Sequence, residues 1–291
     1  MIDNYLWTEL VAFAQYKTLA QTAAKLHVTQ PTITRGMKKL EDDLGVQLFK
    51  RQPNRISLTK TGELAVQEAQ AIVAANEQAV EKIQNFAQSQ QVITIGATIP
   101  GPLILLKSLQ AQLPKQVQLT AQLQQTNIPD LLNRRKFTLL LSDQEIFTDQ
   151  IESRFLGTER LAVNLNQFMY QANQSAITFK ELKGLSFLVL ADIGAWNNVI
   201  NQNIPETKFL YQQQSATFSE ITKYSDFPFF STNLSKFDPQ FDQRNNSEDS
   251  RIELPITDDA AHMPIYGSYL KSQKPALKVI LTEIVQNWPQ D

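Results

Sequence analysis

Residues 19–62 carry a dense succession of structural signals. A short alanine-rich helix is followed by a tight turn, a second helix, a basic hairpin and the start of a further helix. Small residues such as alanine let helices approach closely, and a hairpin directly after a helix pair forms a wing beside it. This order therefore predicts a compact helical head with a two-stranded wing.

The helices of this head are indicated by apolar spacing and by capping residues. Leu6, Leu10 and Phe13 recur at helical spacing, and residues 18–26 predict the next helix. Residues 27–29 then form the turn, with Val28 expected to fill the core beneath it. Thr29 is a natural N-cap for a third helix, where proline in the first turn costs no hydrogen bond. The buried face of this third helix is predicted to be Ile33, Met37, Leu40 and Leu44.

The opposite face of the third helix carries side chains that suit base edges and phosphates. Glutamine pairs with adenine, arginine with guanine, and threonine contacts a thymine methyl group or a phosphate. The hairpin of residues 50–55 adds three basic side chains, with Asn54 at its turn. A polar helix face or a charged hairpin is by itself an ordinary solvated surface, but here the two occur in the order of a winged helix-turn-helix. The polar side chains of the helix are Gln30, Thr32, Thr34, Arg35 and Lys38.

The formal net charge of −2 conceals an uneven distribution. Residues 1–62 hold nine lysines and arginines against five aspartates and glutamates, a net +4, so the rest of the chain carries −6. A basic head on an acidic body is expected when only one end of a protein meets phosphate. The charge therefore favours double-stranded DNA as the partner of the head.

The head resembles the winged helix-turn-helix of the LysR-type transcriptional regulators. The positions that match the family pattern are Phe13, Ala23, Ala24, Leu26, residues 28–31, Leu40, Glu41, Leu44, Gly45, Leu48, Phe49, Arg51, Leu58, Thr59 and Gly62. The resemblance implies a transcription factor that binds an imperfect DNA dyad, with RNA polymerase as a further partner. An alternative is a solute sensor whose head contacts another protein instead of DNA. The DNA contacts that we expect are Thr29, Gln30, Pro31, Thr32, Thr34, Arg35, Lys38, Arg51 and Arg55.

A long helix follows the head. Thr59 fits its N-cap, and residues 63–88 contain neither proline nor glycine. About 28 helical residues span roughly 42 Å. Its narrow apolar stripe either packs on the chain's own body or pairs with a second helix. In the LysR family this helix joins two chains, which implies a homodimer that the family commonly assembles into a tetramer. The stripe consists of Leu64, Ala71, Ala75, Ala79, Ile83 and Phe86.

Beyond residue 90 the pattern changes to alternating strands and helices, which predicts an α/β body with a mostly parallel sheet. The resemblance implies two lobes, as in periplasmic solute-binding proteins, behind an N-terminal all-α winged helix-turn-helix domain and a long linker helix. Strands are expected at 92–95, 117–123, 137–141 and 185–191, and helices at 102–112, 128–134, 178–182 and 275–288. A second run starts at 160–164 and includes an apolar segment at 227–230, and the chain returns near 265–270 to the terminal helix. The expected domains are 1–59 for DNA binding, 60–89 for the linker and dimerisation helix, and 90–291 for the effector, with lobe I at about 90–159 and 265–291 and lobe II at about 160–264.

The resemblance also implies a small-molecule effector between the lobes, at strand ends where backbone N–H groups converge. Hydroxyl groups at these positions suit a small anion, although each residue taken singly is more often a loop or capping residue. Trp196 is either a wall of the pocket or part of the core. Residues 224–230 contain no glycine where the family has a glycine-rich stretch. The expected effector contacts are Thr98, Ile99, Pro100, Ser142, Asp143, Trp196, Ser231 and Thr232.

Other classes of protein are disfavoured by what the sequence lacks. It has no cysteine and two histidines, His27 and His262, which are far apart, so thiolate metal sites and histidine-based catalysis lack their parts. No nucleotide-binding or hydrolase motif occurs. We therefore expect no enzyme, no catalytic residues, no metal and no cofactor apart from a co-inducer. The start of the chain does not resemble a secretory signal, and no segment approaches roughly 18 apolar residues, which predicts a cytoplasmic protein without a membrane partner.

Overall fold

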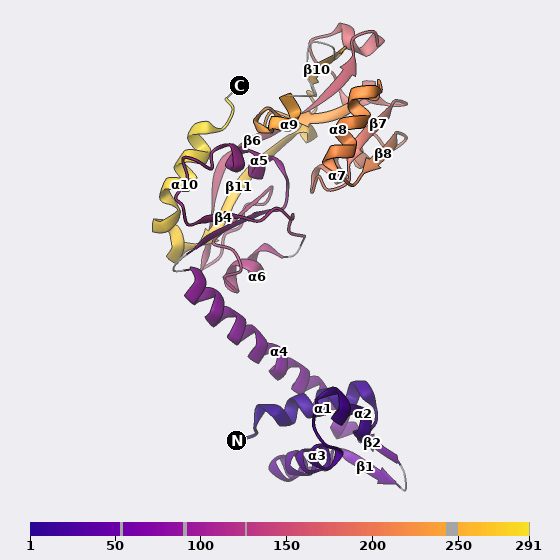
Figure 1. Ribbon diagram of the computed structural model, residues 1–291, viewed down its shortest axis with the longest axis vertical. Helices are drawn as coiled ribbons and strands as arrows, with labels where there is room; N and C mark the ends of the chain where they lie inside the picture. The colour runs from indigo at the N-terminus through magenta and orange to yellow at the C-terminus, as the bar shows by residue number, and fades with distance from the viewer. Residues whose placement is uncertain (53–54, 90–91, 126, 243–249, 291) are drawn as a thin grey trace. The chain divides into compact units, whose positions relative to one another are not determined.

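The computed structural model describes residues 1–52, 55–89, 92–125, 127–242 and 250–290. The chain forms two compact units, Met1–Gln84 and Asn85–Asp291 (Figure 1). The hairpin turn predicted at Asn54 lies outside the described residues. The sequence also predicts an exposed loop at 245–249, which lies outside them as well.

The first unit is a helical head with a two-stranded hairpin, as predicted. The side chain of Thr18 caps the second helix, because its Oγ1 accepts a hydrogen bond from the Gln21 N–H at 3.2 Å. Thr29 occupies the N-cap of the third helix, where its hydroxyl contacts that of Thr32 at 2.9 Å. The elements are α1 (Asn4–Tyr16), α2 (Leu19–Lys25), α3 (Gln30–Leu44), β1 (Phe49–Gln52), β2 (Arg55–Leu58) and α4 (Lys60–Ser89).

The core of the head joins its three helices to the hairpin. Ile33, Met37 and Leu40 are fully buried, and the ring of Phe13 meets that of Phe49 edge-on at 5.4 Å. The prediction that Val28 fills this core is wrong, since its side chain is 40% exposed. His27, at a φ of 55°, reverses the chain there and leaves Val28 at the surface.

Helix α4 begins where the sequence predicts. The Thr59 hydroxyl accepts a hydrogen bond from the Gly62 N–H at 2.9 Å, which caps the helix. Val66 and Ala69 pack into the core of the head. The predicted stripe is exposed along the helix in the single chain, with Leu64 and Ile83 at 57% and 69% exposure.

The second unit is an α/β body, which confirms the predicted class. Helix α10 packs along β6 and β11 (Figure 1). Its strands are β3 (Ile93–Ala97), β4 (Val117–Leu119), β5 (Leu139–Ser142), β6 (Ile151–Asn166), β7 (Ser186–Leu190), β8 (Lys208–Gln212), β9 (Phe229–Thr232), β10 (Arg251–Pro255) and β11 (His262–Leu270). Its α-helices are α5 (Gly101–Ser108), α6 (Ile128–Asn133), α7 (Trp196–Asn203), α8 (Ser215–Tyr224), α9 (Pro239–Asp242) and α10 (Lys274–Asn287). Its 3₁₀ helices are η1 (Tyr170–Asn173), η2 (Phe179–Leu182), η3 (Ser235–Phe237), η4 (Asp259–Ala261) and η5 (Lys271–Gln273).

The sheet is mixed, which corrects the prediction of a mostly parallel one. The strand order is β4-β3-β5-β11-β6-β9-β7-β8, with β10 also paired to β6. Strand β3 is parallel to β4 and β5, and β7 is parallel to β8 and β9. Strand β6 pairs antiparallel with β11, β9 and β10 and so belongs to both lobes. The lobes share this continuous strand and the returning segment from β10 to β11.

Some elements differ from the predicted bounds. The helix expected at 102–112 is α5, which ends at Ser108, and the strand expected at 117–123 is β4, which ends at Leu119. Within the described ranges, no helix combines the length and apolar character needed to cross a bilayer.

Candidate functional site

The first candidate surface is the exposed face of α3. Pro31, Arg35 and Lys38 are exposed at a spacing of four and three residues, so they form one stripe along the helix. Arg35 Nε donates to the Pro31 carbonyl at 3.4 Å, which orients the guanidinium group along this stripe. Thr34 is half-buried, and its hydroxyl donates to the Gln30 carbonyl at 3.0 Å. Arg35 and Lys38 are therefore the basic side chains that this face exposes, beside the neutral Gln30.

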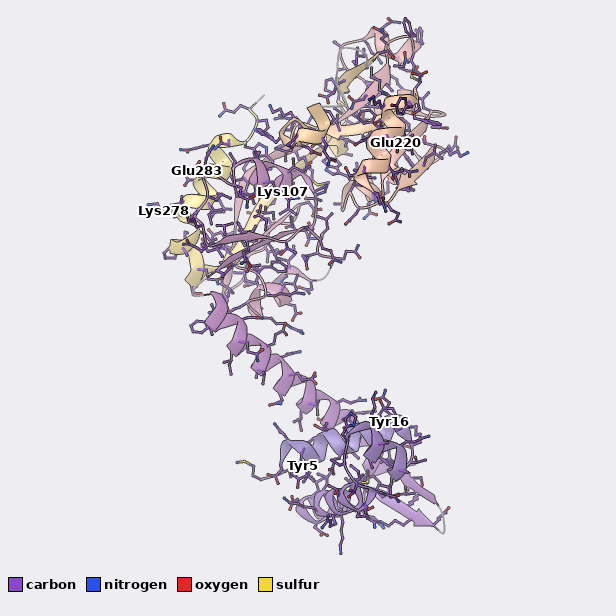
Figure 2. All side chains as sticks on the ribbon, viewed as in Figure 1. Tyr5, Tyr16, Lys107, Glu220, Lys278 and Glu283 are labelled. Atoms are coloured by element: carbon purple, nitrogen blue, oxygen red, sulfur yellow. The ribbon has the colours of Figure 1, made fainter. Side chains whose placement is uncertain are left out.

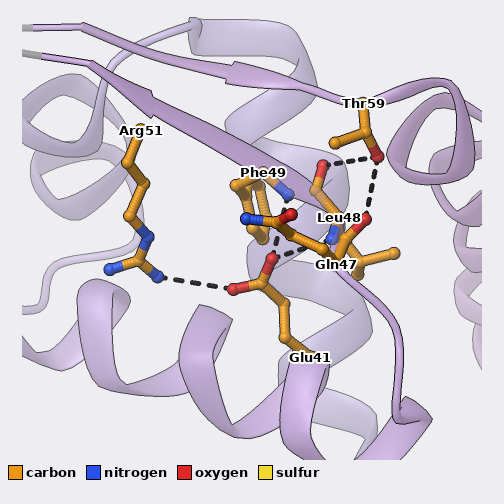
Figure 3. A network of polar contacts seen from close by, with 6 residues as sticks. All are labelled: Glu41, Gln47, Leu48, Phe49, Arg51 and Thr59. Carbon is orange, nitrogen blue, oxygen red and sulfur yellow. Dashed lines mark hydrogen bonds and ion pairs between the residues drawn. The ribbon is translucent and has the colours of Figure 1, made fainter.

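The hairpin is fixed to α3 by Glu41 (Figure 3). Glu41 Oε1 accepts hydrogen bonds from the backbone N–H groups of Leu48 and Phe49 at 2.8 and 2.9 Å. Its other oxygen lies 3.5 Å from Arg51 Nη2. On the opposite side of the strand entry, the Thr59 hydroxyl donates to the Gln47 carbonyl at 2.9 Å. The Glu41 carboxylate thus fixes the hairpin against α3 and forms an ion pair with Arg51.

An open groove of about 820 Å³ lies between the helices and the hairpin of the head. It brings together Gln30 and Thr34 of α3 with Arg51 of β1. The backbone of Arg55 begins β2, and its side chain lies outside the described structure. The other predicted contacts do not line this groove; they are Thr29, Pro31, Thr32, Arg35 and Lys38.

The second candidate site is a cavity of about 140 Å³ in the body, named here the interlobe cavity. Pro100, Gly101 and Ile104, around the start of α5, supply its first-lobe wall. Glu159 and Leu161 come from the strand that both lobes share. The second lobe supplies Leu188, Val189, Leu190, Asp192, Ile193, Trp196, Phe218, Phe230, Ser231, Thr232, Ser235, Asp238 and Phe241.

Glu159 is the most unusual group of the interlobe cavity. Its side chain is 1% exposed, and its Oε2 atom has no hydrogen-bond partner. A Cβ atom at Gly101 would stand 2.1 Å from Glu159 Oε1, so the carboxyl group in its present position packs directly on this glycine. Burial raises the pKa of Glu159 to about 7, and the nearby Thr232 hydroxyl and Trp196 indole oppose this rise. The indole N–H of Trp196 also lacks a partner.

Four of the predicted effector residues line the interlobe cavity: Pro100, Trp196, Ser231 and Thr232. Trp196 is both 2% exposed, within the core, and a wall of the cavity. The hydroxyl of Ser231 is already engaged, since it donates to Glu253 Oε2 at 2.6 Å and accepts from Asn164 Nδ2 at 2.8 Å.

The other four predicted effector residues, Thr98, Ile99, Ser142 and Asp143, do not line the cavity. Gly194, at a φ of 59°, packs against the Thr98 carbonyl and Ile99, so the second lobe covers this loop. Ser142 is fully buried and closes a local turn through the Gln144 backbone.

Sequence reasoning missed Glu159 and most of the apolar wall. In the sequence, Thr158-Glu159-Arg160 reads as a solvated strand, and nothing local shows that its glutamate turns inward. Phe218 lies on α8, a helix that the sequence pattern did not predict, so its place in the wall of the cavity could not be predicted either.

Comparisons with known proteins agree with this architecture. Residues 8–63 match the model of the bacterial regulatory helix-turn-helix protein, lysR family. The chain is 27% identical over 182 residues to the Hca operon transcriptional activator HcaR of Escherichia coli (61% of this chain, 62% of the relative). It is 30% identical over 199 residues to the uncharacterised regulator YybE of Bacillus subtilis (63% of this chain, 66% of the relative). These alignments span less than two thirds of each relative.

Solved structures share the fold over nearly the whole chain. Vibrio fischeri DarR, solved in complex with DNA, superposes with a TM-score of 0.58 at 16% identity, over 98% of this chain and 99% of that one. A full-length OxyR variant from Pseudomonas aeruginosa gives a TM-score of 0.52 at 20% identity, over 98% and 95% of the two chains. The head, residues 8–63, thus matches the lysR family of bacterial regulatory helix-turn-helix proteins, and the whole chain shares its fold with full-length OxyR and DarR.

Proposed function

We propose that the protein is a sequence-specific DNA-binding transcription regulator whose activity responds to a small molecule between the lobes of its body. The observation that carries this proposal is the basic stripe of α3, presented beside a hairpin held in place by Glu41. Relatives described as transcriptional regulators support it, and they support a binding function over catalysis. A protein of this kind acts on chromosomal DNA, in the cytoplasm.

In the proposed complex α3 enters the major groove. Arg35 and Gln30 read base edges, while Lys38, Arg51 and Arg55 contact phosphates. Thr29, Pro31, Thr32 and Thr34 position the start of the helix against the DNA backbone. Arg51 has to exchange its 3.5 Å contact with Glu41 for a phosphate, so its net contribution is smaller than that of Lys38.

The test is a salt series of binding to the promoter DNA around the protein's own gene, read by footprinting. The expected result is a protected dyad of about two or more helical turns that weakens steeply as salt rises. If this promoter is not protected, selection from random duplexes supplies the target. Failure of both would overturn DNA binding and favour a head that contacts another protein.

Arg35→Ala is expected to weaken binding to the selected site by about 1–3 kcal/mol and to relax specificity there. The matched control is Lys278→Ala, which removes an exposed basic side chain from α10 of the body (Figure 2). An equal loss in both variants would contradict a base contact by Arg35.

Two chains are proposed to associate through α4, giving a homodimer and, through further contacts, a tetramer that presents paired heads to RNA polymerase. The exposed stripe with Leu64 and Ile83 supports this assignment. We propose residues 1–59 as the DNA-binding domain, 60–89 as the dimerisation helix and 90–291 as the effector domain. A ligand that prefers one arrangement of the lobes would shift the spacing of the heads.

A further inference from the structure

The charged groups around the interlobe cavity all have one sign. Its titratable side chains are Glu159, Asp192 and Asp238, and no lysine or arginine occurs among the described residues that line it. Most of the remaining wall is apolar, with Leu161, Ile193 and Phe230 among its members. A bound anion would meet carboxyl groups without a compensating cation, and burying an unpaired charge is costly.

The hydrogen-bonding groups of the cavity favour a ligand that donates hydrogen bonds over one that accepts them. Glu159 is nine-tenths buried or more, and its Oε2 lacks a hydrogen bond although the Thr232 hydroxyl and the Trp196 indole lie near the carboxyl group, so the cavity offers an acceptor that a further donor can use. The Ser231 O–H already donates a hydrogen bond to Glu253, so this hydroxyl is not available as a donor to an anion. Thr232 Oγ1 accepts from the Leu234 N–H at 3.3 Å, and its own hydroxyl proton faces the Glu159 carboxyl group as a donor. Trp196 remains as an unpartnered donor.

We propose that the interlobe cavity binds a primary amine on a compact apolar body, with the ammonium group donating to Glu159. This inference rests on the proposed function, since it names the chemical class of the effector. A cavity near 150 Å³ with apolar walls accepts a single benzene ring, and about 140 Å³ is available here. Trp196 and Phe230 supply aromatic faces that favour a cation or a ring.

Binding of an ammonium group is expected to release a proton from Glu159. Near neutral pH the Glu159 carboxyl is partly protonated, because burial raises its pKa to about 7. An incoming ammonium group favours the ionised form, so the carboxyl proton leaves to solvent as the ion pair forms. The other titratable groups of the cavity, Asp192 and Asp238, are exposed and half-buried respectively. Binding at pH 7 should therefore release about half a proton per site.

The test is calorimetric titration of the full chain, without DNA, with benzylamine, benzyl alcohol and benzoate. These probes share one ring and differ in charge. Benzylamine is expected to bind at least about tenfold more tightly than benzyl alcohol, and benzoate more weakly than either. Titrations in two buffers of different ionisation enthalpy measure the proton release on the unmodified chain.

Glu159→Gln is expected to lower benzylamine affinity at least about tenfold, to abolish proton release and to leave benzyl alcohol binding nearly unchanged. The matched control is Glu220→Gln, the same chemical change at an exposed position of α8 (Figure 2). Tighter binding of benzoate, a benzylamine Kd above about 1 mM, or benzylamine binding without proton release would each overturn the proposal. Since DNA is absent, these outcomes are independent of the footprinting result that tests the proposed function.

Discussion

Glu159 makes the stability of the body depend on pH. Its pKa is about 7 in the folded chain against an ordinary 4.5, so the native state holds more protons than the unfolded state between these values. Glu159 therefore contributes fully to the free energy of unfolding below pH 4.5, and this contribution is lost as the pH rises through 7. Glu159→Gln stays neutral throughout, so it should be up to roughly 3 kcal/mol more stable than the native chain at about pH 8 and similar to it at about pH 5. Urea unfolding at both values measures this difference, and parallel pH profiles would refute it.

Gly62 shows how a single residue limits the junction between the hairpin and α4. A Cβ atom there would stand 2.2 Å from the Leu48 carbonyl oxygen, which also accepts from the Thr59 N–H at 2.8 Å. Because the obstacle is backbone, Gly62→Ala is expected to destabilise the head by about 1–3 kcal/mol. Hydrogen exchange within residues 1–84 reports the change, with Thr61→Ala, on the exposed side of the same turn, as the control. Equal protection in the two variants would show that the junction adapts.

Capping residues were predictable at this scale because their partners are close in sequence. Thr29 and Thr59 occupy the expected helix starts. The exposure of Val28 follows from the left-handed conformation of His27, whereas the burial of Glu159 involves Gly101, far along the chain, which no local pattern reports.

At the scale of elements, α4 carries its apolar stripe on the outside of the single chain. If this stripe is the proposed dimer contact, Ile83→Glu places a charge in that contact and should shift the protein toward monomer. The control Gln84→Glu adds the same charge at the neighbouring exposed position. Sedimentation velocity distinguishes them: a monomer in the first variant and a dimer or tetramer in the second is the expected result. An unchanged size in both would remove α4 from the interface.

Elements with strong local signals were predicted, and those defined by the sheet were not. The head helices and α10 follow apolar periodicity, so their existence was clear from the sequence. Strands β8 and β10 carry polar residues and owe their conformation to pairing with β7 and β6. The mixed sheet follows from β6 and β11 running antiparallel, and direction is a long-range property.

For the whole molecule, the division of charge between a +4 head and a −6 body leads us to expect that the proposed binding to DNA depends on the head alone. Lys38→Ala should weaken binding to all duplexes about equally and reduce the salt slope by about one ion. Lys107→Ala, which removes a basic side chain of α5 in the body, should leave the slope unchanged (Figure 2). Fluorescence anisotropy at several salt concentrations measures both slopes. A slope that changes only with Lys107 would reverse the assignment of the phosphate-binding surface.

The place of β11 in the sheet has a consequence for how the protein is made. Residues 262–270 are synthesised late, yet they fill the position between β5 and β6. The ribosome therefore releases the head first, with its own complete core, while the body still has two open strand edges. A chain that stops before residue 262 would therefore combine a complete head with a body whose β5 and β6 edges are still unpaired.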